Sequence, residues 1–298
     1  MFKILISLLF VVSGVAAADP IPVTVVWPSD IGGTQANRVR LMVQQANAIQ
    51  NKYQFFFENR PGGGGSVGAR YMLTNRGINV MVWTSSWFVR PIFYPTESYN
   101  LNDFKPVSIQ CTNFPYVMLS KKYQSYADLK KQKRITIGTI GGSAAESLVH
   151  ELRRQLPNTD VTFVPYNSMT RPRLDVVGDV LDVNIDLPSD SLQWVENGTL
   201  NVIGGSGPSS HGPFRSFRSQ GITGYEDLAS NFFIIAPNSL DKKTTSELHD
   251  VFANVDADPQ MIKMFNDDFC RPVNLDEEQT NTLYARWVKF WPTVLKKQ

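Results

Sequence analysis

Short apolar runs alternate with segments of helical periodicity along most of this chain. The run at 21–26 is short and rich in β-branched residues, which predicts a buried strand. Between 35 and 49, apolar residues recur every three or four positions, which predicts a helix with one buried face. A strand at 53–58, a helix ending near 74 and a strand at 80–83 follow. Because strands alternate with helices, we expect a parallel sheet flanked by helices.

The same alternation resumes in the middle of the chain and gives way to helices in the last third. We predict strands at 107–110, 116–120, 135–139, 161–164, 183–186, 200–204 and 232–236, and helices at 126–131, 144–156, 173–180, 191–196, 242–253, 259–266 and 277–296, the last apart from Pro292. A second set of βαβ units implies a second α/β lobe. We therefore expect one lobe from 19–120 plus 232–298 and another from 121–231.

The first residues have the layout of a secretory signal peptide. A short basic start is followed by an apolar stretch at 4–15 and by three alanines at 16–18. The apolar stretch is shorter than the roughly 20 residues that span a bilayer. We expect cleavage after Ala18, which would send a soluble protein to the periplasm.

The net charge argues against nucleic acid or a membrane surface as the partner. The chain has 298 residues and a net charge of +2, which is too small to indicate nucleic acid or a membrane surface. Its two cysteines, Cys111 and Cys270, leave two possibilities open: one disulfide, or two separate buried thiols.

A run of four glycines, Gly62–Gly65, lies between a predicted strand and a predicted helix. Bare amides at the N-terminus of a helix bind anions, because these N–H groups lack partners and the helix dipole is positive there. No Gly-Lys-Ser/Thr closes the run, so it is not a phosphate-binding P-loop. A flexible turn is the alternative interpretation. The run predicts a small anionic ligand held largely by main chain.

Four loops that follow predicted strands are rich in small and hydroxyl residues. They are Ser29–Thr34, Pro61–Ser66, Thr84–Ser86 and Gly141–Ser143. Ligands of open α/β sheets lie beyond the carboxyl ends of the strands. Since the loops come from both lobes, we expect a two-lobed periplasmic-binding fold of type II, with a central ligand cleft that closes by a hinge.

The sequence contains no convincing set of catalytic residues. The segment 141–145 hints at a nucleophile elbow, but it lacks the second glycine of G-x-S-x-G. His150 follows Ser143 too closely along one helix to act as the usual base, and a helix cap is the simpler role for that serine. His211 and His249 lie far away, outside any Cys/His cluster. We expect no catalytic residue, no metal and no cofactor.

One motif carries a family resemblance. The segment 58–69 resembles the ENRPGAGGNIGA signature of the substrate-binding proteins of tripartite tricarboxylate transporters, also called the Bug family. Further segments agree in order: 27–34 with the family's first glycine loop, 103–107 with "DFTPVA", 164–167 with "VPYKG", 182–200 with "VDLMFDN…KAGKLR", and 256–259 with "LADPEV". The likeness covers nearly the whole chain after residue 18.

The resemblance implies a two-lobed binding protein for small carboxylates, which serves a membrane permease or a sensor. It implies that two loops of the first lobe hold one ligand carboxylate, and that a loop of the second lobe meets the other end. Asp186 matches an aspartate near the family's pocket, where an acidic side chain would suit an amino or hydroxyl group of the ligand. The expected ligand-binding residues are Ser29, Gly32, Gly33, Thr34, Gly62, Gly63, Gly64, Ser66, Thr84, Ser85, Gly142, Ser143, Ala144 and Asp186.

The chain also departs from the family pattern. Gln35 stands where the family has Asp, and the segment 75–80 is shorter than the family's "PDGYTLL". Trp83 is expected in the core or at a lobe contact rather than on the ligand. Arg171 and Arg173 are expected in solvent, although arginine can also fork a carboxylate.

Together these observations favour a monomeric periplasmic protein that captures a di- or tricarboxylate-like organic acid for a tripartite tricarboxylate-type permease. A sensor component working with a histidine kinase is the second hypothesis, and an enzyme on the same scaffold is the third. The sequence leaves the identity of the acid open.

Overall fold

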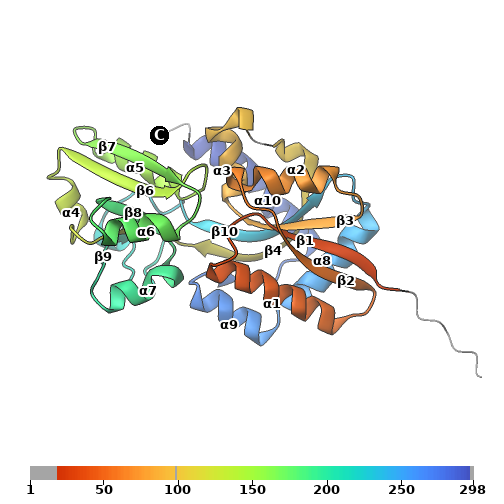
Figure 1. Cartoon of the computed structure of the whole chain (residues 1–298). Helices are drawn as coiled ribbons and strands as arrows, with labels where there is room; N and C mark the ends of the chain where they lie inside the picture. The colour runs from red at the N-terminus through yellow and green to blue at the C-terminus, as the bar shows by residue number, and fades with distance from the viewer. Residues whose placement is uncertain (1–18, 98, 296–298) are drawn as a thin grey trace, which may run out of the picture.

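The computed structural model describes residues 19–97 and 99–295, arranged as two α/β lobes (Figure 1). The predicted signal peptide, residues 1–18, lies outside the described residues. Within them, no helix combines the length and apolarity that crossing a membrane requires.

The first sheet has six strands in the order β11-β4-β10-β3-β1-β2. Its strands are β1 (Ile21–Trp27), β2 (Tyr53–Asn59), β3 (Ile78–Thr84), β4 (Phe104–Phe114), β10 (Ser230–Pro237) and β11 (Arg271–Pro272). Strand β1 lies between β2 and β3 and pairs parallel with both. Their alternation with helices produces this arrangement, as the sequence predicts.

The second sheet has five strands in the order β7-β6-β8-β5-β9. They are β5 (Val117–Ser120), β6 (Arg134–Ile140), β7 (Asp160–Tyr166), β8 (Val183–Asp186) and β9 (Asn201–Gly205). Strand β6 pairs parallel with β7 and β8.

The expected parallel pairing accounts for only part of each sheet. Strand β10 runs antiparallel to both β3 and β4, and β5 runs antiparallel to both β8 and β9. The chain leaves the first sheet along β4 and re-enters it along β10, so these two neighbours point in opposite directions. Each sheet is therefore mixed.

Helices cover both faces of the first sheet (Figure 1). The helices α1, α8 and α9 contact one another on one face, whereas α2, α3 and α10 lie on the other. Their bounds, with those of the second lobe, are α1 (Thr34–Ile49), α2 (Ser66–Thr74), α3 (Ser86–Phe93), α4 (Tyr126–Leu129), α5 (Glu146–Gln155), α6 (Thr170–Val177), α7 (Pro188–Glu196), α8 (Lys242–Asp256), α9 (Pro259–Asp267) and α10 (Glu277–Leu295).

Two helices differ from the prediction. The sequence analysis did not predict α3, whose apolar residues and internal Pro91 conceal its helical period. Helix α10 continues through Pro292 rather than being interrupted there.

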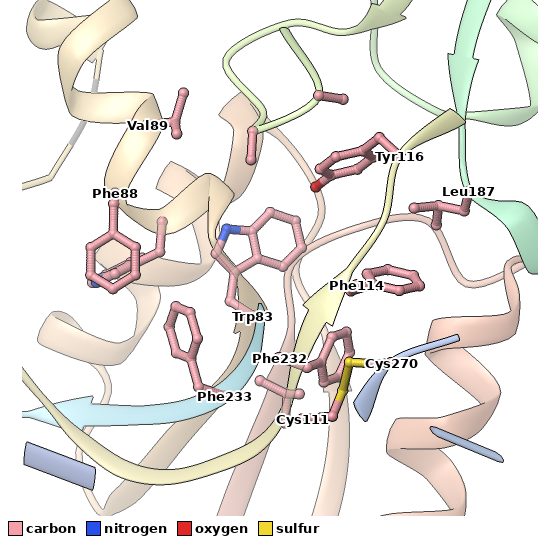
Figure 2. Packing of buried hydrophobic residues seen from close by; sticks show 14 of the residues in the cluster. Trp83, Phe88, Val89, Cys111, Phe114, Tyr116, Leu187, Phe232, Phe233 and Cys270 are labelled. Atoms are coloured by element: carbon pink, nitrogen blue, oxygen red, sulfur yellow. A yellow bond between two sulfur atoms is a disulfide. The ribbon is translucent and has the colours of Figure 1, made fainter. Parts of the chain in front are cut away.

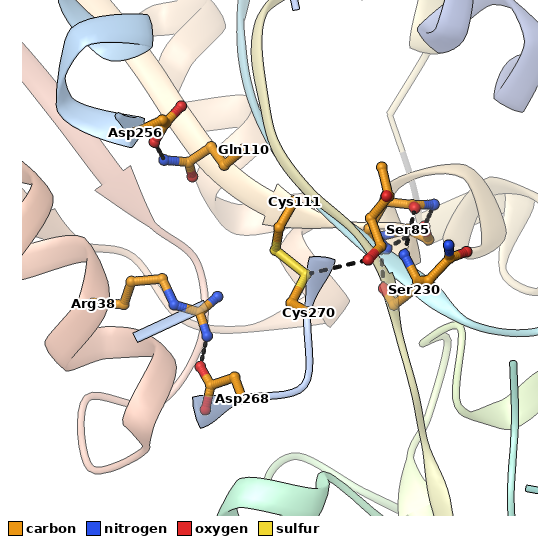
Figure 3. The surroundings of a disulfide bond; sticks show 11 residues. Arg38, Ser85, Gln110, Cys111, Ser230, Asp256, Asp268 and Cys270 are labelled. Carbon is orange, nitrogen blue, oxygen red and sulfur yellow. Dashed lines mark hydrogen bonds and ion pairs between the residues drawn. A yellow bond between two sulfur atoms is a disulfide. The ribbon is translucent and has the colours of Figure 1, made fainter. Parts of the chain in front are cut away.

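A disulfide between Cys111 and Cys270 settles the question that the sequence left open. It ties β4 to the residue before β11, across 159 positions of sequence (Figure 3). Both cysteines are buried in the apolar core of the first lobe (Figure 2). Covalent linkage of distant segments restricts the unfolded chain and so stabilises the folded one.

The exact lobe bounds stay a prediction. Because β5 pairs within the second sheet, we propose that the chain first crosses between the lobes before Val117 rather than after residue 120.

Candidate binding site

A cavity of about 640 Å³ lies between the two lobes and is lined by residues of both. Its size falls in the range of small-molecule binding sites. Seven of the expected site residues line it: Ser29, Gly62, Gly63, Gly64, Thr84, Gly142 and Ser143. The other seven do not.

The glycine run forms one wall of the cavity. Gly62 to Gly65 all have positive φ, between 57° and 122°, which explains why glycine occupies these positions. Gly65 N donates to Gly62 O, but the N–H groups of Gly63 and Gly64 donate to no acceptor among the described residues. Helix α2 begins directly after this turn, at Ser66. The wall thus presents two unpaired amides at a helix N-terminus.

The asparagine that ends β2 holds the two loops of the first lobe together. Asn59 Nδ2 donates to Trp27 O at 2.9 Å and to Ser29 O at 2.7 Å. The Trp27 indole in turn donates to Asp30 O at 3.0 Å. This network fixes the position of Ser29 beside the glycine run.

Arg90 lines the cavity on α3, and the sequence analysis did not identify it. A Cβ built at Gly64 would lie 3.1 Å from Arg90 Cδ, and one built at Gly142 would lie 2.4 Å from Arg90 Nη1. The guanidinium also lies 4.1 Å from the centre of the Tyr94 ring and 3.4 Å from Gly141 O. It therefore fills the space between glycines of both lobes, where a side chain at either would collide with it.

The start of α1 contacts the second lobe. Thr34 Oγ1 donates to Asp190 Oδ1 of α7 at 3.0 Å. Gly33 caps the helix through its extended backbone, and Gly32 is exposed with open space around it. None of the three lines the cavity, although Gln35 does.

The loop of the second lobe is held by bonds within the protein. Gly142 N donates to the Glu146 carboxylate at 2.6 Å, and Ser143 Oγ donates to Ile140 O at 2.7 Å. Ala144 does not line the cavity, and its N–H donates to Ser86 Oγ of α3 at 3.1 Å. The amides of Gly142 and Ala144, which we expected to bind the ligand, thus already donate hydrogen bonds within the protein.

Asp186 is committed to a buried ion pair. Its side chain is fully buried and accepts hydrogen bonds from Arg173 Nε at 2.5 Å and Arg173 Nη2 at 3.0 Å. Asn184 Nδ2 and Leu187 N donate to the same carboxylate. Arg173 is buried, so the expectation that it is solvated is wrong; Arg171 is exposed, as expected. We assign Asp186 a structural role behind the cavity.

The remaining two serines also lie behind the lining. Ser85 Oγ accepts hydrogen bonds from N and Nδ2 of Asn231, both at 3.0 Å, and Ser85 N donates to Ser230 Oγ (Figure 3). These bonds link the end of β3 to the start of β10. Ser66 is fully buried at the start of α2.

Aromatic side chains make up much of the remaining wall. Trp83, Phe114 and Tyr116 all line the cavity, and Phe114 and Tyr116 lie with Leu187 to one side of Trp83 (Figure 2). Burial raises the pKa of the Tyr116 hydroxyl, which therefore stays neutral at physiological pH. Single aromatics scattered through the sequence resemble core residues, so only Trp83 was considered beforehand.

The described residues contain no group of His, Cys, Asp and Glu side chains that could hold a metal ion. His150 stacks on Phe93 with ring centroids 4.6 Å apart, rather than approaching Ser143 as a base would. The cavity thus offers amides, hydroxyls, one guanidinium and aromatic surfaces.

Residues 41–298 match the model of the tripartite tricarboxylate transporter family receptor. The chain belongs to this family. Its members are receptors of tripartite tricarboxylate transporters rather than enzymes. The family resemblance in the sequence is thereby confirmed.

Known relatives agree with this assignment. A curated relative from Agrobacterium vitis, the UPF0065 protein in the TAR-I ttuE-ttuC' intergenic region, is 26% identical over 186 residues. The match covers 59% of this chain and 53% of the relative, so the chain spans about half the length of that protein.

Solved structures show the same two-lobed fold. A periplasmic transporter superposes with a TM-score of 0.80 at 21% identity, covering 95% of this chain and 98% of the other. Rpa4515 of R. palustris, solved with adipate, gives 0.79 at 22% identity, covering 92% and 96%. MatC (Rpa3494) from Rhodopseudomonas palustris, solved with bound malate, gives 0.77 at 18% identity, covering 93% and 99%.

Proposed function

We propose that this protein captures a small organic acid in the cavity between its lobes. The observation that carries the proposal is the pair of unpaired amides at Gly63 and Gly64, beside the guanidinium of Arg90. A carboxylate placed there accepts charge-assisted hydrogen bonds and faces the N-terminus of α2. Two similar folds are solved with the carboxylates adipate and malate, which is consistent with an acid here.

Binding and closure support each other in this scheme. The first lobe supplies the glycine wall and Ser29, and the second lobe covers the ligand with the loop around Ser143. Covering excludes water and so strengthens each electrostatic contact. A micromolar affinity corresponds to about −8 kcal/mol, which several charge-assisted bonds of roughly 1.5–3 kcal/mol each can supply after ordering costs.

We further propose that the protein is exported through the signal peptide at 1–18, acts as a monomer in the periplasm and delivers its ligand to a permease of the tripartite tricarboxylate type. Family membership favours transport over sensing. A neighbouring gene for a histidine kinase, with none for a permease, would favour a sensor instead. Co-purification with the permease from membranes tests the coupling.

The Gly64→Ala variant tests the glycine wall. The added Cβ requires a strained backbone at φ 57° and contacts Arg90, so we expect affinity for the acid to fall at least about tenfold, or 1.4 kcal/mol. Gly198→Ala is the matched control, because Gly198 also has positive φ but has open space around it and lies outside the cavity lining. Isothermal titration calorimetry measures both. Equal affinities in the two variants would contradict the proposed site.

A further inference from the structure

The cavity combines free amides and a full positive charge in one place. A Cβ at Gly64 would lie 3.4 Å from Arg90 Nη1, so the guanidinium and the unpaired amides of Gly63 and Gly64 converge on the same region. Arg90 is the only Lys or Arg among the described residues that line the cavity. A single ligand carboxylate can accept hydrogen bonds from both amides and pair with the guanidinium.

The first alternative anion position, the N-terminus of α1, already faces a carboxylate of the protein. Asp190 accepts the hydrogen bond from Thr34, the first residue of that helix. Asp30, in the preceding loop, lines the cavity and adds a second negative charge on this side. A ligand carboxylate here would be repelled.

The second alternative, the loop of the second lobe, is also unsuitable. Gly142 N is bonded to Glu146 and Ala144 N to Ser86. Glu146 is only 6% exposed, so its carboxylate lies directly behind the loop with little screening by water. The loop can contact a neutral group of the ligand, but it is a poor partner for a second negative charge.

The N-terminus of α6 contributes only a partial charge. Met169 caps this helix and lines the cavity, and Pro172 in its first turn has no N–H to donate. Leu187, at the start of α7, lines the same side and is followed by Pro188. The second-lobe lining also includes Ser143, Tyr166 and Asn167, but no lysine or arginine among the described residues, so this wall offers apolar surface and neutral polar groups and suits a neutral part of the ligand.

Aromatic rings complete the enclosure. Trp83, Phe114, Tyr116 and Leu187 all line the cavity, and Phe114, Tyr116 and Leu187 lie to the same side of Trp83 (Figure 2). Rings of this kind pair favourably with another aromatic ring, edge-on or offset, beyond the gain from burial alone. A cavity of about 640 Å³ also has room for a ring in addition to a carboxylate.

We infer that the ligand is an aromatic monocarboxylate, with its carboxylate at Gly63, Gly64 and Arg90 and its ring against Trp83, Tyr116 and the apolar second-lobe wall. This inference rests on the proposed function and narrows the class of acid. It departs from the di- and tricarboxylates that the family resemblance implies.

Calorimetric titration with four acids tests it. The probes are 3-phenylpropanoate, its dicarboxylate counterpart 3-(4-carboxyphenyl)propanoate, adipate and malate. We expect 3-phenylpropanoate to bind at least about tenfold more tightly than each of the three diacids, a difference of 1.4 kcal/mol. Tighter binding of any diacid would overturn the inference while leaving the proposed function intact. If none of the four acids and no other carboxylate bound, the proposed function itself would fail.

A charge placed on the apolar wall provides the second test. Met169→Arg should raise affinity for 3-(4-carboxyphenyl)propanoate at least about tenfold relative to 3-phenylpropanoate, because the second carboxylate gains a partner. Ile262→Arg is the control, since Ile262 is 37% exposed on α9 and lies outside the cavity lining. Thermal melts confirm that both variants fold. An unchanged affinity ratio in Met169→Arg would contradict the placement of the ring end.

Discussion

Arg90 and the glycines around it show how single residues shape the cavity. The guanidinium packs on Tyr94 and contacts Gly141 O. A side chain at position 64 or 142 would collide with it, so both positions require glycine. The glycine run was recognisable in the sequence, because consecutive glycines at a strand–helix junction indicate a backbone that other residues cannot adopt. Arg90 was a weaker signal: one charge within the apolar stretch of α3.

The ion pair of Asp186 with Arg173 could not be predicted from the sequence. The sequence places Asp186 correctly at the end of a strand, but its partner comes from a helix 13 positions away. Sequence alone treats Arg171 and Arg173 alike, whereas the fold buries one and exposes the other. Which of two neighbouring cations is buried depends on how α6 docks on β8.

The two arginines therefore predict different stability losses. Arg173→Leu leaves the Asp186 carboxylate buried without its cation, and we expect the free energy of unfolding to fall by about 3–5 kcal/mol. Arg171→Leu removes a solvent-exposed guanidinium from the Asp175 carboxylate, which keeps its hydrogen bond from the Tyr166 hydroxyl, and should cost less than about 1 kcal/mol. Urea denaturation followed by circular dichroism measures both. Equal losses would show that the buried pair is not formed.

At the scale of elements, periodicity located most strands and helices but not the directions of the strands. Apolar runs reveal that a segment is buried, and the same run fits a parallel or an antiparallel neighbour. The antiparallel β4 and β10 follow from the chain's passage to the second lobe and back, which no local pattern records. Helix α3 was missed because it is apolar on nearly every side.

The contact of α8 with β4 predicts a pH dependence. Asp256, the last residue of α8, accepts hydrogen bonds from Gln110 at 2.7 Å and from Ser108 at 3.2 Å (Figure 3 shows Gln110). Burial raises the pKa of its carboxyl to about 7, against roughly 3.9 in an unfolded chain. Between these values the folded state binds more protons, so this group makes folding more favourable as the pH falls from about 7 to 4.

Asp256→Asn removes that contribution. We expect the free energy of unfolding of the wild type to rise relative to the variant as the pH is lowered through this window, with little further change in the difference below about pH 4. Denaturation curves at pH 4 to 8 provide the comparison. Parallel pH profiles for the two proteins would show that the carboxyl titrates normally in the folded state.

For the whole molecule, the two sheets position a cavity that neither lobe forms alone. Contacts between Thr34 and Asp190 and between Ser86 and Ala144 join the lobes on different sides of it. The two-lobed architecture was predictable from the repeated βαβ pattern together with the predicted signal peptide. The aromatic walls were not, because Trp83, Phe114 and Tyr116 meet only after the chain has folded.

Binding of a carboxylate by the glycine wall is the central claim, and amide chemical shifts test it most directly. Selective ¹⁵N labelling of glycine allows the tightest-binding acid of the panel to be titrated while each labelled amide is observed. We expect the Gly63 and Gly64 signals to move in a saturable way as their amides gain a charged acceptor, and those of Gly77 and Gly198, which lie outside the cavity lining, to stay in place. Saturation of binding with the Gly63 and Gly64 signals unmoved would contradict the account.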